Sequence, residues 1–182
     1  ISRGCLSACS FCQTRLARGR LVSFRPGDIL NRARQAIDQG VKQLWVTSQD
    51  TGAYGRDCDY PLWRLLENLC NLEGDFRVRL GMTSPLWIWQ DLQPMLEVFA
   101  HPKLFRFLHI PVQSGSDRIL AAMKRGNTVA QFEAVCNAFL ERHEDLSLMT
   151  DLIVGYPGES DEDFQATLDL VERVPMAAIN RS

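Results

Sequence analysis

Apolar residues recur along the chain at two spacings, and each spacing predicts a different kind of element. Where they return every three or four positions we expect helices. In residues 26–40, for example, Ile29, Ala33 and Ile37 share one helical face, and Gly40 supplies the stop. The same spacing predicts further helices over residues 61–70, 88–100, 116–124, 128–143 and 160–174.

Short, dense apolar runs between these helices predict strands. Residues 42–50 begin with KQLWV, which is typical of a strand buried on both faces. Further strands are expected within residues 76–84, 104–112, 146–157 and 176–180. Pro94 should kink the helix over 88–100 or split it in two. Thr128 and Gln131 have the spacing of a capping box.

Strands and helices alternate throughout the 182 residues, which predicts one α/β domain with a parallel sheet, either open or closed as a barrel. In such folds functional residues gather at the carboxyl ends of the strands. Polar clusters fall at these ends in residues 48–51, 83–85, 113–115 and 155–158. We expect the cysteine-containing loop of residues 4–19 to open on the same edge.

Composition and charge refine this picture. The chain is 46% hydrophobic and 23% charged, as in ordinary globular proteins. No apolar run reaches the roughly 18 residues of a membrane span, so no membrane association is expected. Both ends of the chain look cut, and we interpret it as a fragment. The first 25 residues carry five arginines and no acid, which predicts either a phosphate-binding patch or a solvated loop. These arginines are Arg3, Arg15, Arg18, Arg20 and Arg25.

Three cysteines within eight residues are the clearest chemical signal. Six cysteines are too few for a disulfide scaffold in a chain of this size, and pairing within the trio Cys5, Cys9 and Cys12 would leave one thiol over. A structural zinc site would need a fourth ligand. The other cysteines are isolated and are interpreted as small hydrophobic residues: Cys58, Cys70 and Cys136. An iron–sulfur cluster fits the trio better, because three ligands leave one iron of a [4Fe–4S] cluster open to a small molecule. Zinc remains the alternative.

The C-x3-C-x2-C spacing, with Phe11 before the last cysteine, resembles the signature of radical S-adenosylmethionine (SAM) enzymes. Five segments resemble, in order and spacing, the methylthiotransferase branch of that family: GCLSACSFCQTRLARG, TSQDTGAYGRD, RLGMTSP, HIPVQSGSDRILAAMKRGNT and DLIVGYPGESDEDF. The second and third are most similar to archaeal and eukaryotic enzymes that modify N6-threonylcarbamoyladenosine in tRNA. The SQDT sequence also resembles the branch that modifies a ribosomal protein.

This resemblance implies a parallel (β/α) partial barrel of the radical SAM type, truncated near the sixth strand, with residues 1–182 as its radical SAM core domain. It implies a transferase that inserts a methylthio group at C2 of N6-threonylcarbamoyladenosine, beside the anticodon, through a 5′-deoxyadenosyl radical. The cofactors would be a [4Fe–4S] cluster and SAM. The partners would be the tRNA anticodon stem-loop, in the full-length enzyme, and an electron-donor protein, and the location would be cytoplasmic. The family's amino-terminal second-cluster domain and carboxy-terminal RNA-binding β-domain have no counterpart in these residues.

By the same resemblance, Cys5, Cys9 and Cys12 ligate the cluster. The residues expected to bind SAM are Phe11, Ser48, Gln49, Asp50, Ser84, Gln113, Gly155 and Pro157. Gln49 stands where many relatives have glutamate, so an amide oxygen replaces a carboxylate near the SAM ammonium. No further catalytic side chain is predicted, and Lys124 and Arg125 are interpreted as favourable charges at a helix end.

Two alternatives remain open. The first is a methylthiotransferase that acts on a ribosomal-protein aspartate or on N6-isopentenyladenosine in tRNA. The second is a non-catalytic iron–sulfur or zinc module that contacts RNA through its arginine-rich start.

Overall fold

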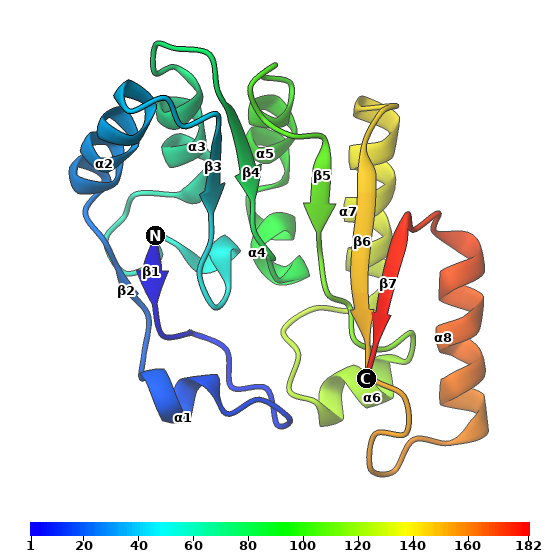
Figure 1. The fold of residues 1–182 in the computed structure, drawn as a ribbon. Coiled ribbons are helices and arrows are strands. Elements are labelled where there is room, and N and C mark those ends of the chain that lie inside the picture. The colour runs from blue at the N-terminus through cyan, green and yellow to red at the C-terminus, as the bar shows by residue number, and fades with distance from the viewer.

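A curved sheet of five parallel strands forms the centre of the computed structural model, which describes all 182 residues (Figure 1). The strands are β3 (Gln43–Val46), β4 (Arg77–Leu80), β5 (Phe107–His109), β6 (Ser147–Leu152) and β7 (Ala178–Arg181). β3 pairs with β4, and β5, β6 and β7 pair in that order. A bridge from Val78 to Leu104 and a hydrogen bond from the Thr83 N–H to the His109 carbonyl (2.9 Å) join the two ladders. The predicted parallel partial barrel is therefore confirmed, as an arc that does not close.

Helices connect successive strands, and in Figure 1 most of them lie behind the sheet or at its two sides. They are α2 (Pro26–Asp38), α3 (Leu62–Cys70), α4 (Pro85–Gln90), α5 (Leu92–Phe99), α6 (Asp117–Ala122), α7 (Val129–Arg142) and α8 (Asp161–Arg173), with a 3-10 turn at Thr51–Ala53. Val78 and Leu80 of β4 are buried against this helical layer, while the alternate residues Arg77 and Arg79 are not. The core therefore occupies the outer side of the arc.

The expectation that the strand of residues 42–50 is buried on both faces is wrong. Trp45, at the centre of β3, is 63% exposed. Helices cover only one face of the arc, so its inner face carries aromatic and charged residues instead of a second apolar layer. On that face the Arg79 guanidinium lies over the rings of Trp45 and Phe107, at 4.8 and 4.5 Å from their centroids.

The predicted helix over 88–100 is split, but at Asp91 and not at Pro94. Asp91 leaves helical geometry (φ −114°, ψ 29°) and separates α4 from α5. Pro94 lies in the first turn of α5, where a missing N–H leaves no hydrogen bond unmade. The capping box is confirmed, because the Thr128 hydroxyl accepts from the Gln131 N–H and the Gln131 side chain accepts from the Thr128 N–H.

The start of the chain lies beside β3. β1 (Ser2–Arg3) pairs antiparallel with β2 (Val22–Ser23), and the Ile1 ammonium donates to the Thr47 carbonyl (2.8 Å). The segment between β1 and β2 contains the cysteines and the short helix α1 (Thr14–Arg18), and Figure 1 places it at the carboxyl ends of the parallel strands, as predicted. No helix is long and apolar enough to span a membrane.

Candidate functional site

The cysteine loop is closed at its base by a tight backbone contact. Gly4 has a φ of +73°, and a Cβ placed on it would lie 2.1 Å from the Arg20 carbonyl oxygen. The Cys5 N–H donates to the Gly19 carbonyl (3.3 Å) across the same base. Only glycine fits a left-handed conformation against a neighbouring backbone. Gly4 therefore allows the two ends of the cysteine loop to come together next to the paired strands β1 and β2.

The three cysteines of the loop differ in exposure. Cys5 and Cys9 are half-buried, Cys12 is exposed, and burial raises the pKa of the Cys5 thiol. No group of three or more Cys, His, Asp or Glu side chains surrounds a single point that could hold one metal ion. A cubane cluster makes a different demand, because it takes one thiolate at each of its separate iron corners.

The isolated cysteines behave differently from one another. Cys70 and Cys136 are buried, and burial raises their thiol pKa values to about 11 and about 12. Their interpretation as small hydrophobic residues is confirmed. Cys58 is exposed in the loop before α3, so that interpretation is wrong for it.

The polar residues that follow β3 divide into two groups. The Asp50 carboxylate is buried and accepts hydrogen bonds from the Ser84 N–H (3.0 Å) and the Trp87 indole N–H (2.8 Å). Burial raises the pKa of Asp50, and these two donors oppose the rise. By contrast, Ser48 Oγ and Gln49 Oε1 are buried atoms without any hydrogen-bond partner. Buried polar atoms are normally paired, so these two atoms lack the partner that a bound ligand would supply.

The ends of β4 and β5 carry Ser84 and Gln113, both buried. Ser84 is the N-cap residue of α4, and its hydroxyl makes no capping bond. Gln113 adopts a φ of +81°, which is strained for a residue other than glycine. Its N–H donates to the Asp151 carbonyl and its carbonyl accepts from the Ile153 N–H, each at 2.9 Å. The sheet thus holds this backbone in place, and the side chain makes no hydrogen bond within the protein.

The loop after β6 reaches across to the cysteine loop. The Tyr156 hydroxyl lies 2.8 Å from Ser10 Oγ and donates to the Ala122 carbonyl (3.1 Å) at the end of α6. The Ser10 N–H donates to the Met123 carbonyl (3.0 Å). Three segments far apart in the sequence therefore meet at the edge where the strands end. Gly155 and Pro157 flank Tyr156 and are exposed there.

Arg125 is the residue that sequence reasoning most clearly misjudged. Its side chain donates from Nη2 to the Pro111 carbonyl (2.7 Å) and from Nη1 to the Cys9 sulfur (3.5 Å). The interpretation of Arg125 as a favourable charge at a helix end is therefore incomplete. Its side chain contacts Pro111, which follows β5, and Cys9, which lies 116 positions earlier in the chain. The only signal in the sequence was its place within the MKRGNT segment of the resemblance.

The residues proposed from the sequence are only partly connected in the structure. Hydrogen bonds join Asp50 to Ser84, and they join the cysteine loop to the loop containing Tyr156. Phe11 is 39% exposed and stands within the cysteine loop, between two of the thiols. No side-chain hydrogen bond links Gln113 to the other candidates.

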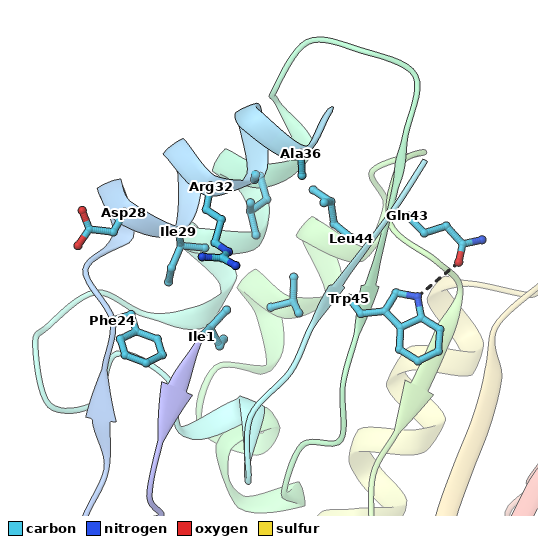
Figure 2. Close-up of a pocket in the computed structure, with 12 residues that line it drawn as sticks. Ile1, Phe24, Asp28, Ile29, Arg32, Ala36, Gln43, Leu44 and Trp45 are labelled. Carbon is cyan, nitrogen blue, oxygen red and sulfur yellow. Dashed lines mark hydrogen bonds between the residues drawn. The ribbon is translucent and has the colours of Figure 1, made fainter. Parts of the chain in front are cut away.

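An apolar pocket of about 580 Å³ lies away from this edge, between α2 and β3 (Figure 2). Ile29 and Ala36 of α2, Leu44 of β3, and Ile1 line it. None of the residues predicted to bind SAM or the cluster takes part in this pocket.

Asp163, at the start of α8, fastens the two loops that follow β5 and β6. Its carboxylate accepts from the Ser116 hydroxyl (2.5 Å), from the Ser160 N–H (3.0 Å) and from the Arg118 guanidinium. These hydrogen bonds hold the pKa of the Asp163 carboxyl well below its ordinary value, and the one from Arg118 has the largest effect. The ionised form is thus the one that the folded protein prefers.

Replacing Asp163 with asparagine is expected to lower the free energy of unfolding at pH 7. A lowered folded-state pKa stabilises the fold above the ordinary carboxyl pKa near 4, and this stabilisation is lost as the pH falls through the folded-state value. The difference between the variant and the parent should therefore shrink below about pH 4. Urea unfolding between pH 7 and pH 3 measures it. Asp161→Asn, an exposed acid in the same helical turn, is the control and should change stability less at every pH; a constant deficit for Asp163→Asn would contradict this account.

The protein is thus an α/β domain with an open arc of parallel strands. Its candidate site lies at the carboxyl ends of these strands, where the cysteine loop and the unpaired polar atoms are found. The sequence model of the radical SAM superfamily matches residues 1–171. The chain belongs to the radical SAM superfamily, whose cofactors are SAM and a [4Fe–4S] cluster.

Curated relatives confirm the particular branch that the motifs suggested. The chain is 43% identical to a probable threonylcarbamoyladenosine tRNA methylthiotransferase of Pyrococcus abyssi, over 100% of this chain and 43% of the relative. It is 45% identical to the human threonylcarbamoyladenosine tRNA methylthiotransferase, over 100% of this chain and 32% of the relative. The chain thus spans less than half the length of these relatives.

Solved structures of distant sequence share the fold. A cobalamin-dependent S-adenosylmethionine radical enzyme, OxsB, aligns over 96% of this chain and 27% of its own, with a TM-score of 0.74 and 15% identity. Coproporphyrinogen III oxidase from Escherichia coli, a radical SAM enzyme, aligns over 99% of this chain and 42% of its own, with a TM-score of 0.62 and 20% identity.

Proposed function

We propose that this chain is the radical SAM core of a tRNA methylthiotransferase that modifies C2 of N6-threonylcarbamoyladenosine next to the anticodon. The observation that carries the proposal is identity of 43% or more, over the whole chain, to archaeal and animal relatives named for that activity. The transferase activity, the tRNA substrate, a cytoplasmic location and an electron-donor protein belong to the full-length enzyme. The further domains of that enzyme lie outside residues 1–182.

The cluster is proposed to bind Cys5, Cys9 and Cys12, which leave one iron free for SAM. When bound, the reduced cluster and SAM supply a 5′-deoxyadenosyl radical. The residues present fit this pair of cofactors in two respects. The thiols come from one loop at the functional edge, and Ser48 Oγ and Gln49 Oε1 stand there as unpaired acceptors.

The chain's own side chains bind and orient SAM in this proposal. Ser48 and Gln49 accept hydrogen bonds from its ammonium group. Asp50 acts beside them, and its bonds to Ser84 and Trp87 fix the strand end against α4. Gln49 provides an amide where a carboxylate would add charge, so the ammonium contact is a neutral hydrogen bond.

The rest of the SAM molecule is proposed to lie against the neighbouring strand ends. Ser84 and Gln113 reach its ribose or carboxylate from β4 and β5. Gly155 and Pro157 form a turn whose backbone approaches the adenine, and Phe11 packs beside that ring and shields the cluster from water. Protein groups thus position the cofactor and exclude solvent, and the cofactor does the chemistry.

Binding of tRNA is supported by the arginine-rich start of the chain. Its five arginines form no salt bridge with any carboxylate of this chain, so their charges are available to phosphates. Four of them are exposed, and α1 carries two of the five beside the cysteine loop.

Anaerobic reconstitution with iron and sulfide tests the core of this proposal. We expect the 182-residue chain to cleave SAM to 5′-deoxyadenosine after dithionite reduction, but to form no methylthiolated nucleoside. In cells that lack the parent gene, mass spectrometry of tRNA nucleosides should show loss of the 2-methylthio group from N6-threonylcarbamoyladenosine, restored by the full-length parent. An unchanged nucleoside profile with an unmodified ribosomal protein would overturn the tRNA assignment, and a colourless protein with one bound zinc would overturn the enzyme assignment.

A further inference from the structure

The side chain of Arg125 is held in place next to a proposed cluster ligand. Arg125 lies in the turn after α6, which ends at Ala122. Its guanidinium is anchored by the 2.7 Å hydrogen bond from Nη2 to the Pro111 carbonyl. From this anchor, Nη1 is directed at the Cys9 sulfur at 3.5 Å. One planar group therefore joins the segment after β5 to the cysteine loop.

The charge of Arg125 is not neutralised by an ion pair. No carboxylate lies within salt-bridge distance of it, although the buried Asp50 is near enough for their charges to interact. Its Nε is buried and has no hydrogen-bond partner. The guanidinium thus remains a positive charge without a direct ion-pair partner, in a partly desolvated position where charges act more strongly than in water.

A fixed cation that donates to a ligand sulfur favours the more negative state of an iron–sulfur cluster. One-electron reduction, with the electron supplied by dithionite in the assay, makes the cluster one unit more negative. Hydrogen bonds to the sulfurs, net charge and solvent exposure set the potential at which this happens. An N–H···S contact from a guanidinium adds both a hydrogen bond to the sulfur and a positive charge, and both stabilise the reduced form of the cluster.

We propose that Arg125 is a positioning residue that raises the reduction potential of the cluster through its contact with Cys9. The inference rests on the proposed function, because it requires the cluster to be bound by Cys5, Cys9 and Cys12. Arg125 acts through the ligand sulfur, so the proposal assigns it no contact with the acceptor substrate.

The test is a redox titration of the anaerobically reconstituted protein, monitored by electron paramagnetic resonance without SAM. Arg125→Gln removes the charge and should lower the ratio of reduced to oxidised cluster about tenfold at a fixed potential, which for one electron corresponds to about 59 mV. Arg125→Lys retains the charge but cannot bridge Pro111 and Cys9 in the same way, and it should give an intermediate shift. Lys124→Gln, which removes an exposed charge from the adjacent residue, is the matched control and should leave the potential unchanged.

Iron content separates this role from a purely structural one. If Arg125→Gln binds less iron than the parent, the redox titration of Arg125→Lys at full iron content tests the inference instead. A reduction potential of Arg125→Lys equal to that of the parent would then overturn it. An unchanged potential combined with weaker SAM binding would also overturn it and would assign the guanidinium to SAM. A parent protein that binds no cluster on these cysteines would instead refute the proposed function.

Discussion

Replacing Cys5, Cys9 or Cys12 with serine is expected to abolish cluster binding and SAM cleavage. A serine hydroxyl stays protonated at neutral pH and is a poor ligand for iron, whereas thiolates bind clusters of this kind. Because only three irons have a protein ligand, the loss of one cysteine leaves the cluster held at two irons. Iron should fall from about four per chain to background, and the broad visible absorption should disappear with it. Formation of 5′-deoxyadenosine, measured by chromatography, should fall to background as well.

Cys58→Ser is the matched control for these variants. Cys58 is exposed like Cys12 but lies outside the loop, so its replacement should leave both the iron content and SAM cleavage unchanged. If a serine variant of the loop kept the iron content of the parent, or if Cys58→Ser lost iron, the assignment of the cluster ligands would be wrong.

Gly4→Ala should be among the most damaging single-methyl additions in the chain. Its left-handed backbone alone costs about 1–2 kcal/mol for a residue with a Cβ. The added carbon would also lie 2.1 Å from the Arg20 carbonyl oxygen and 2.6 Å from the carbonyl carbon, both backbone atoms that cannot rotate away. We expect a total loss of about 3 kcal/mol or more in the free energy of unfolding. Because the base of the cysteine loop must open to relieve the clash, iron binding should weaken too.

Gly19→Ala is the control that separates the cost of backbone strain from the cost of the steric clash at the base of the cysteine loop. Gly19 has a similar φ of +77° and lies across the loop base from Gly4, but a Cβ added to it would meet no atom within 4 Å. Its ψ of −164° puts it in a region that essentially only glycine adopts, so Gly19→Ala should lose the backbone cost alone, about 1–3 kcal/mol, and less than Gly4→Ala. Urea unfolding of both variants, with iron content measured in parallel, provides the comparison. Equal losses would show that the contact with Arg20 does not constrain the loop.

The secondary structure was predictable where its causes are local. The capping box of Thr128 and Gln131 and the apolar face of α2 depend on residues within a few positions of one another. The break between α4 and α5 was predictable in kind but not in place. Pro94 suggested it, but the proline is tolerated in a first turn, and the chain turns at Asp91 instead.

The candidate site was predictable as a set of segments but not as a set of contacts. Alternating elements and the cysteine spacing were enough to place the loop and the polar strand ends on one edge. They did not show that Asp50 is bonded to Ser84 and Trp87 while Ser48 and Gln49 keep unpaired atoms. Ser48, Gln49 and Asp50 are adjacent polar residues in the sequence, but only the side chain of Asp50 has hydrogen-bond partners within the protein. The packing of the folded chain determines this difference.

The sequence by itself determined the order of the helices and parallel strands from residue 26 onward, the three-thiol motif and the family, because each depends on spacing along the chain. The tertiary structure alone decided that Trp45 faces the open interior, that Gly4 lies against Arg20, and that Arg125 reaches Cys9. The physical reason is that the last two are contacts between residues distant in the chain, and the first depends on which face of the sheet the helices cover. The pairing of β1 with β2 brings Gly4 against Arg20, and the order in which the strands assemble brings Arg125 to the cysteine loop. No local pattern encodes either.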